Sequence, residues 1–492
     1  MNILSDLSEV EEINQRKQPA YTIIKSHWFF KGDNRLDGGF YAEKAETAMR
    51  ILENSKSSIE PLSNLVSKIY IISRFKRIYT NNEQFGWPYI TPTETLSFRP
   101  KIDRFISKEN APITSTLHFS KQGWLLMTAS GTIGRLTYVT PRLEKYFLSH
   151  DLIRIIPNSE YSSAYLYAYL STWIGQALIT KDKYGGAIKH LEPVHIENVP
   201  IPLLTKNIRE NISQEIKHVF TLREKANNLL DQSIDKLHEL LYLPEFDEAL
   251  TPYLPQPIDQ SDKTFPTRGL KAFSVNLSGL DERFDASYQV PISRAVVKLL
   301  RQSKYNLTTI HNLSTSIYLP DRFKRSYVEE NYGVPFLQSS HVPQQKPIDL
   351  KYISTRVNDK NIAQCIIKKG QILITRSGTI GRIMVVPSDL DGWAASEHLI
   401  RISPKNDVNP GYIAAFLESP YGQHQLQSKI YGGVVDELTE NDTGNIFIPE
   451  APTKITDEIG NLVINAYDLK YKAAKIENEV IKFLEDYLEN PK

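Results

Sequence analysis

The chain contains an internal repeat that divides its 492 residues into two similar halves. Four short motifs of the first half recur in the same order in the second half, each about 248 residues later. The pairs are Arg35–Tyr41 with Arg283–Tyr288, Arg74–Tyr79 with Arg322–Tyr327, Ser130–Arg135 with Ser377–Arg382, and Tyr184–Gly186 with Tyr431–Gly433. Two copies are too few for a solenoid, which needs about three repeats or more to bury a continuous core. The repeat therefore predicts two similar domains.

Each copy has the same order of predicted elements. Short apolar runs at 123–127 and 370–375, bounded by Gly, Pro and Asn, predict β-strands directly before the Ser-Gly-Thr motif. Helix-like segments follow at 164–170 and 412–417. These elements indicate mixed α/β domains in a chain of the α+β class.

Each copy closes on a segment with the pattern of a long amphipathic helix. Apolar residues recur at steps of three and four over 203–243 and 454–488, and no Pro interrupts either segment. Two matching stripes favour an antiparallel coiled-coil pair that relates the domains by a pseudo-twofold axis. The alternative is a helix packed on its own domain. Five prolines at 244–267 predict an extended linker between the copies.

These patterns divide the chain into five predicted segments. They are a first domain at 1–202, a spacer helix at 203–243, the linker at 244–267, a second domain at 268–450 and a second spacer helix at 451–492.

The sequence lacks the common marks of an enzyme, of a metal site and of a membrane protein. It has no Gly-x-x-x-x-Gly-Lys-Ser/Thr phosphate loop, and its only cysteine, Cys365, has no companion at metal-ligand spacing. No apolar run approaches the roughly 20 residues that span a bilayer. The polar N-terminus and the lone cysteine favour the cytoplasm. His150 and His398 both precede a Leu-Ile-Arg run, and we interpret them as structural or DNA-contact residues rather than catalytic ones.

The repeated motifs are suited to contacting a phosphate backbone. Arg-Phe-Lys-Arg at 74–77 and 322–325 places three cations around an aromatic ring in each copy. The Ser-Gly-Thr-Ile-Gly-Arg motif combines a tight loop with hydroxyl and guanidinium donors, although its glycines are equally typical of a plain hairpin. The candidate DNA-binding residues are Arg74, Lys76, Arg77, Tyr79, Ser130, Thr132, Arg135, Tyr184 and Lys189 in the first copy, and Arg322, Lys324, Arg325, Tyr327, Ser377, Thr379, Arg382 and Tyr431 in the second.

With these motifs the chain resembles the specificity (S) subunit of type I restriction-modification systems over nearly its whole length. The resemblance implies two target-recognition domains that read the halves of a split double-stranded DNA target. It implies no catalytic residue, metal or cofactor in this chain. Two methyltransferase (M) subunits would carry S-adenosylmethionine, and restriction (R) subunits would use ATP and Mg.

Three other interpretations stay open at this point. The chain could be the recognition module of a different DNA-modification or phage-defence complex, with the same sequence features. It could be a nuclease or methyltransferase itself, although their motifs are missing. It could also be a scaffold whose helices hold protein partners without DNA.

Overall fold

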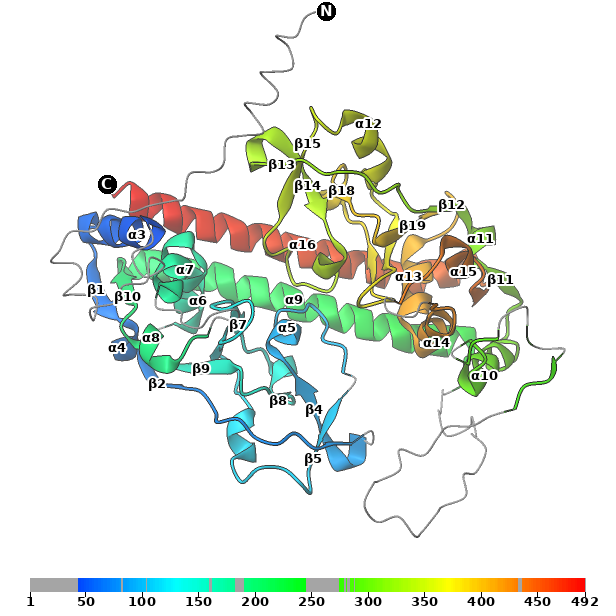
Figure 1. Ribbon diagram of the computed structural model, residues 1–492, viewed down its shortest axis with the longest axis horizontal. Coiled ribbons are helices and arrows are strands. Elements are labelled where there is room, and N and C mark those ends of the chain that lie inside the picture. The colour runs from blue at the N-terminus through cyan, green and yellow to red at the C-terminus, as the bar shows by residue number, and fades with distance from the viewer. Residues whose placement is uncertain are drawn as a thin grey trace, which may run out of the picture. The chain divides into compact units, whose positions relative to one another are not determined.

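Figure 1 shows the computed structural model, which describes residues 43–80, 83–102, 104–158, 162–181, 190–244, 274–277, 280, 284–286, 288–431 and 436–491. Several features of the sequence lie outside these residues: Arg35–Tyr41, Arg283, Tyr184–Gly186 with Lys189, and all of the 244–267 linker after Pro244. The described chain divides into two compact units. Unit 1 holds the residues up to Leu96, Lys101–His218 and the residues from Ile476 on. Unit 2 holds Ser97–Pro100 and Val219–Lys475.

Unit 1 contains two four-stranded sheets, with strand orders β2-β9-β6-β7 and β3-β5-β4-β8, and a two-stranded pair, β1-β10. All neighbouring strands run antiparallel except β4 and β8. The strands are β1 (Ser58–Pro61), β2 (Val66–Tyr70), β3 (Tyr79–Thr80), β4 (Gly86–Ile90), β5 (Phe105–Ser107), β6 (Leu125–Thr128), β7 (Leu136–Tyr138), β8 (Phe147–Leu148), β9 (Leu152–Pro157) and β10 (Pro200–Leu203). The helices are α3 (Glu43–Asn54), α4 (Leu62–Leu65), α5 (Pro92–Thr95), α6 (Ser163–Ser171), α7 (Trp173–Thr180) and α8 (Pro193–Glu197).

Unit 2 repeats this topology strand for strand, with orders β12-β19-β16-β17, β13-β15-β14-β18 and β11-β20. Its strands are β11 (Leu307–Thr309), β12 (Ser314–Tyr318), β13 (Tyr327–Val328), β14 (Gly333–Leu337), β15 (Lys351–Ser354), β16 (Ile372–Thr375), β17 (Ile383–Val385), β18 (Ala394–Ala395), β19 (Leu399–Pro404) and β20 (Phe447–Pro449). Its helices are α10 (Pro291–Leu300), α11 (Ile310–Leu313), α12 (Asp359–Ile362), α13 (Pro410–Glu418), α14 (Pro420–Ser428) and α15 (Glu440–Gly444). The predicted duplication of a mixed α/β domain is confirmed.

The predicted strands before the Ser-Gly-Thr motif are β6 and β16, each inside a sheet between two antiparallel neighbours. All four residues of β6 and all four of β16 are buried. In each unit the helix after the sheet, α6 or α13, contacts the edge strand β7 or β17. A strand covered on both faces requires apolar residues at consecutive positions, which explains the unbroken runs in the sequence.

Each predicted helix-like segment is the first of two short helices in series. Thr172 ends α6 and caps α7, where its hydroxyl accepts a hydrogen bond from the Gly175 amide at 3.0 Å. Ser419 does the same between α13 and α14, accepting from the Gly422 amide at 3.3 Å. Both caps satisfy an amide that the helix itself leaves without an acceptor.

The two predicted spacer helices are α9 (Lys206–Leu241) and α16 (Thr453–Glu489). Within unit 2 their apolar residues enter one core, which includes Leu230, Leu237, Ile459 and Val463. An ion pair of 3.2 Å links Lys236 of α9 to Glu458 of α16.

The direction of these two helices follows from their contacts inside unit 2. Lys236 meets Glu458, whereas Asn227, earlier in α9, and Lys470, later in α16, both contact Phe98. The helices therefore run antiparallel, as the matching stripes predict. The C-terminal part of α16 lies in unit 1, where Tyr167 donates to the Glu477 carboxylate at 2.8 Å. The two helices therefore pair with each other and do not pack only on their own domains, although α16 also contacts its own domain, where Tyr467 donates to the Ile383 carbonyl at 2.7 Å.

Candidate nucleic-acid interface

The Arg-Phe-Lys-Arg segment of each unit is held by its phenylalanine. The Phe75 ring lies 4.8 Å from His118 and 5.9 Å from Phe147, ring centre to ring centre. Phe323 packs against a buried cluster around Phe336 and Ile353. The aromatic side chain therefore points inward and holds the loop, while Arg74, Lys76 and Arg77 in unit 1 and Arg322 and Lys324 in unit 2 are exposed.

Exposed tyrosines follow these segments directly. Tyr79 and Tyr327 begin the edge strands β3 and β13 and are 40% and 44% exposed. In unit 1 the Arg77 guanidinium lies 5.7 Å from the centre of the Tyr89 ring and hydrogen-bonds Tyr79, which contributes to raising the pKa of Arg77 against the effect of burial. Each unit thus presents cations and a phenol at one sheet edge.

The Ser-Gly-Thr-Ile-Gly-Arg motif forms the hairpin turn between β6 and β7, and between β16 and β17 in unit 2. Gly131 and Gly134 have φ values of 71° and 78°, in the left-handed region that favours glycine. The Thr128 hydroxyl bridges the turn, because it accepts from the Arg135 amide at 3.0 Å and donates to the Thr132 carbonyl. The hairpin interpretation is confirmed, and phosphate contact by this loop remains a prediction. Thr132 and Thr379 are exposed at the turn, and Arg135 and Arg382 are half-buried after it.

In unit 2 three of the four repeated motifs meet around two glutamates. Glu437 pairs with Arg376 and lies 3.6 Å from Arg322. It also accepts from the Tyr431 hydroxyl at 3.4 Å, and its backbone pairs with that of Ser377.

The second glutamate, Glu397, continues the network. It pairs with Arg325, and its other oxygen lies 3.6 Å from His398. His398 in turn shares a 2.7 Å hydrogen bond with the Ser377 hydroxyl. Burial opposes ionisation of Glu397, but a backbone hydrogen bond and Arg325 hold its pKa below the ordinary value. Two of the three cations in Arg322–Arg325 therefore have carboxylate partners.

The equivalent positions in unit 1 carry histidines. The backbone of His190 pairs with Ser130, as that of Glu437 pairs with Ser377. His150 lies 3.3 Å from Asp151, and burial first, then Arg77 and Arg74, lower the pKa of His150 despite Asp151. No ion pair of Arg74 or Arg77 is seen among the described residues. The cationic segment of unit 1 is therefore less neutralised than that of unit 2.

Strand register corrects the predicted match between His150 and His398. Thr128 pairs with Leu152, and Thr375 pairs with Leu399. Counting back from these leucines, His150 corresponds to Glu397, and Asp151 corresponds to His398. Each copy therefore has a histidine next to a carboxylate, but the two residues stand in the opposite order. The Leu-Ile-Arg sequence that follows both histidines suggested a match that the strand register does not support.

The arginine of this Leu-Ile-Arg run is structural in both units. Arg154 is fully buried and donates to backbone carbonyls of Leu148, Leu152 and Ser149. Burial lowers the pKa of Arg154 to about 10. Arg401, also fully buried, donates to four carbonyls in the same way. Through Leu148 of β8, Arg154 ties the two sheets of unit 1 together behind the exposed cations.

Comparison with known proteins identifies the family of this chain. The sequence profile described as "Type I restriction modification DNA specificity domain" matches residues 68–232 and 318–476, well over half of the chain. The chain belongs to this family. Each matched range contains three of the four repeated motifs of one copy and runs into its long helix. As a member, the chain is a DNA-recognition protein with two specificity domains.

Solved structures of the same kind are similar over most of the chain. The S subunit of a type I restriction-modification system from M. genitalium is 13% identical, with 89% of this chain and 96% of that chain covered and a TM-score of 0.35. The HsdS subunit from Thermoanaerobacter tengcongensis is 14% identical, with 88% and 97% covered and a TM-score of 0.28. No curated protein matches the sequence.

The specificity domains bring together only part of the predicted DNA-binding set. In unit 2, Arg322, Arg325, Ser377 and Tyr431 share one network, with Lys324, Tyr327, Thr379 and Arg382 on the same two loops. In unit 1, Arg77 and Tyr79 lie together. Tyr184 and Lys189 lie outside the described residues.

Sequence reasoning missed Arg376, Glu397 and Glu437, which connect the unit 2 network. The glutamates are not shared by the two copies, so a search for identical motifs passes over them. A search for charge differences between the copies would have found both, as Glu397 against His150 and Glu437 against His190. Among the described residues no group of three His, Cys, Asp or Glu is arranged to hold a metal, and no helix has the length and apolar character to cross a membrane.

Proposed function

We propose that this chain is the non-catalytic specificity subunit of a type I restriction-modification complex in a bacterial or archaeal cytoplasm, and that each of its domains reads one half of a bipartite DNA target. The observation that carries the proposal is the duplicated specificity domain, which presents an aromatic-anchored cationic loop and a Ser-Gly-Thr hairpin in each copy. Two similar domains in one chain are suited to two separate stretches of duplex DNA.

The chemistry of each domain supports contact with duplex DNA. The exposed Arg and Lys side chains supply the charge that displaces counterions from phosphates. Arginines and the exposed Tyr79 and Tyr327 can also reach sugars or base edges. Because the phenylalanine anchors hold these loops, little ordering entropy is lost on binding.

The long helices α9 and α16 are the surfaces we assign to two M subunits, which R subunits then join. Each helix exceeds 35 residues and keeps many charged, exposed positions beside its buried stripe. In this scheme S-adenosylmethionine belongs to the M subunits, and ATP and Mg belong to the R subunits. The isolated chain is then expected to bind DNA weakly and to modify none.

The test is to map methylated adenines in cells that express this chain together with M subunits from the same host. We expect a split motif with two short specified parts. Exchanging residues 43–203 for the corresponding domain of another family member should change one part and leave the other intact. A contiguous motif, or a change in both parts, would contradict the division of reading between domains. Methylation by the isolated chain with S-adenosylmethionine would contradict its non-catalytic role.

A further inference from the structure

A fifth short motif recurs in both halves of the chain, and the proposed function assigns no role to it. The sequence aromatic-Gly-x-Pro stands at Phe85–Pro88 and again at Tyr332–Pro335. In each unit the aromatic residue ends a short 3-10 turn, Glu83–Phe85 or Glu330–Tyr332, and the glycine begins β4 or β14. The two copies therefore carry an aromatic side chain at the same point of the same sheet.

Packing explains the glycine of this motif but not its aromatic residue. A Cβ atom at Gly333 would lie 2.7 Å from the Ile353 carbonyl oxygen, a backbone atom of the neighbouring strand β15. Phe85 and Tyr332, by contrast, are 64% and 72% exposed. A single exposed ring is normal on a protein surface. A ring that is exposed at the equivalent position of both copies indicates instead that each copy uses it to contact another molecule.

Strand register places this ring beside the cationic loop in unit 1. β3 and β4 lie on either side of β5, and both run antiparallel to it. The Ser107 amide at the end of β5 donates to the Ile78 carbonyl, and the Lys108 amide donates to the Phe85 carbonyl, both at 2.9 Å. The next row of the sheet therefore holds Arg77, Lys108 and Phe85, which are all exposed.

Unit 2 has the same arrangement with different residues. The Ser354 amide at the end of β15 donates to the Ser326 carbonyl at 2.9 Å, and β14 pairs along the other side of β15. The next row of this sheet therefore holds Arg325, Thr355 and Tyr332. In both units the exposed ring stands beside the last arginine of the Arg-Phe-Lys-Arg segment.

The backbone that carries each ring is fixed by hydrogen bonds. The Lys108 ammonium donates to the Gln84 carbonyl at 2.9 Å, next to the bond between the Lys108 amide and Phe85. In unit 2 the Tyr332 amide closes its turn on the Glu329 carbonyl at 3.0 Å. Because the turn is already ordered, little conformational entropy is lost when the ring binds a partner.

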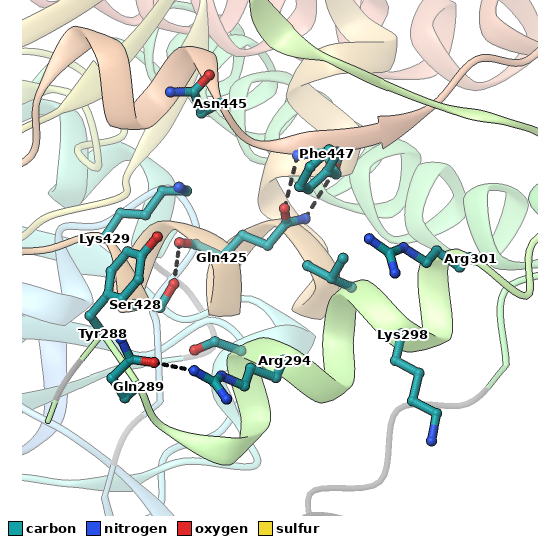
Figure 2. A pocket seen from close by; sticks show the side chains of 12 residues that line it. Tyr288, Gln289, Arg294, Lys298, Arg301, Gln425, Ser428, Lys429, Asn445 and Phe447 are labelled. Carbon is teal, nitrogen blue, oxygen red and sulfur yellow. Dashed lines mark hydrogen bonds between the residues drawn. The ribbon is translucent and has the colours of Figure 1, made fainter. Parts of the chain in front are cut away.

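A pocket of about 350 Å³ between α10 and α14 in unit 2 differs from these surfaces, because polar side chains in its wall are engaged within the protein (Figure 2). Arg294 donates to the Gln289 side chain, and the Gln425 side chain bonds both the amide and the carbonyl of Phe447. These contacts belong to the packing of unit 2, whereas the exposed rings of Phe85 and Tyr332 extend into solvent.

We propose that Phe85 and Tyr332 each pack against a base of the half-site that their own domain reads. This proposal rests on the proposed function, because it requires each domain to bind duplex DNA. Arg77 and Lys108 beside Phe85, and Arg322 and Lys324 in the loop beside Tyr332, favour a polyanion as the partner.

The ring supplies what the cations lack, an apolar face that can pack on a base. Apolar side chains that insert at a base step unstack it and bend the duplex, at a cost that depends on the base sequence. A ring carries no charge, so its contribution to affinity is independent of salt. Tyr332 also has a hydroxyl that can donate to an acceptor on a base edge, which Phe85 lacks.

DNA binding by the full chain in complex with M subunits tests the proposal. The probes are a duplex that carries the target found by methylation mapping and a scrambled duplex of the same length. Phe85→Ala should weaken binding to the mapped target about fivefold or more, a typical loss for one base stack, and should leave the salt slope unchanged. Affinity for the scrambled duplex should stay the same. Tyr332→Ala should behave likewise, whereas Tyr332→Phe keeps the ring and should retain most of the affinity.

Duplexes with one scrambled half-site assign each ring to its half. The effect of Phe85→Ala should disappear when the half read by the first domain is scrambled, and the effect of Tyr332→Ala when the other half is. Val194→Ala is the matched control and should bind like the unaltered complex. It shortens a 59% exposed apolar side chain on α8, a helix that contacts β2 and α4 rather than the sheet of β5.

Unaltered affinity of both alanine variants for the mapped target, with normal circular dichroism spectra, would overturn the proposal. Equal losses on the mapped and scrambled duplexes would overturn it too, because the rings would then contact the sugar–phosphate backbone. Loss of M subunits in size-exclusion chromatography without DNA would assign the rings to a protein contact instead. If the unaltered complex bound no DNA, the proposed function would fail as well. If the unaltered complex bound the mapped target and the alanine variants bound it equally well, only the role of the rings would be refuted.

Discussion

The ammonium group of Lys470 on α16 lies 4.9 Å from the centre of the Phe98 ring, although 372 residues separate the two in sequence. Phe98 belongs to Ser97–Pro100, a short segment of the first copy that packs within unit 2. Its amide donates to the Pro343 carbonyl at 2.7 Å, and its carbonyl accepts from Asn227 at 3.1 Å. The neighbouring Arg99 pairs with Asp231 at 2.7 Å. Phe98 therefore forms part of the interior of unit 2, and Arg99 adds a partly exposed ion pair at its edge.

Burial of Lys470 makes the stability of this region depend on pH. Burial, with a contribution from Arg223, lowers the pKa of Lys470 to about 7, whereas in the unfolded chain it is near 10.5. Between these values the unfolded state binds more protons, so the free energy of unfolding rises with pH. Lys470→Met removes this dependence and should be more stable by a few kcal/mol below about pH 7, with the difference shrinking toward pH 10.

Urea unfolding of both proteins between about pH 6.5 and 9.5 measures this difference. The exposed Lys472→Met variant, half a turn further along α16, is the control and should follow the unaltered protein at every pH. If the free energies of unfolding of Lys470→Met and of the unaltered chain changed in parallel with pH, Lys470 would be charged in the folded protein and the prediction would be wrong.

A second prediction uses the unequal charge of the two cationic loops. In a complex with the M subunits, replacing Arg74, Lys76 and Arg77 by Ala should weaken binding to cognate and unrelated DNA together. The slope of log affinity against log salt concentration should become less steep. The change should correspond to the loss of up to about three phosphate contacts, each of which contributes roughly 0.9 to the slope. The same change at Arg322, Lys324 and Arg325 should flatten it by about one contact, because Glu437 and Glu397 already neutralise two of these cations.

Fluorescence anisotropy over a range of salt concentrations provides the measurement, with Lys121→Ala as an exposed control. If the first triple variant lost affinity for cognate DNA alone and kept its salt slope, these residues would read bases rather than phosphates. Equal slopes for the two triple variants would contradict the asymmetry.

A third prediction concerns the junction of α13 and α14. A Cβ atom at Gly422 would overlap the Phe416 carbonyl oxygen and the Leu417 Cα, both of which are backbone atoms that cannot easily move. Gly422→Ala should therefore lower the free energy of unfolding by about 1–3 kcal/mol. The exposed position Gln427 on the same helix is the control, and Gln427→Ala should change it by less than about 0.5 kcal/mol. Urea unfolding monitored by circular dichroism compares the two, and equal midpoints would rule out the steric conflict.

The sequence predicts the parts of this fold that leave a regular pattern. The near-constant spacing of the motifs predicts two similar domains, and the three–four stripes predict α9 and α16 and their pairing. The domain boundaries at 202, 243, 267 and 450 stay predictions. The place of Ser97–Pro100 has no local signature, because the contacts of Phe98 and Arg99 with Asn227, Asp231 and Lys470 join residues more than 120 positions apart.

The candidate site is less predictable, for a physical reason. Shared motifs locate Arg322–Arg325 and Ser377, but the partners that set their charge, Glu397 and Glu437, differ from the first copy. Their effect arises from side chains that approach within 4 Å only after folding. Motifs that are identical in the two copies therefore locate the cationic loops. Residues that differ between the copies determine how much of the positive charge of each loop is neutralised.

The last prediction tests the difference in neutralised charge between the two cationic loops. It concerns Glu437, which pairs with Arg376 and lies 3.6 Å from Arg322. Glu437→His installs the residue of the first copy, His190, and should free both guanidinium groups for phosphate. In the complex with M subunits, affinity for unrelated DNA should rise about three- to tenfold at low salt. The salt slope should steepen by one to two contacts of roughly 0.9 each. Glu437→Asp keeps the charge and is the matched control, while His190→Glu should change unit 1 in the opposite direction. Unchanged slopes in both exchanges, with correctly folded complexes, would mean that these positions do not tune the charge available to DNA.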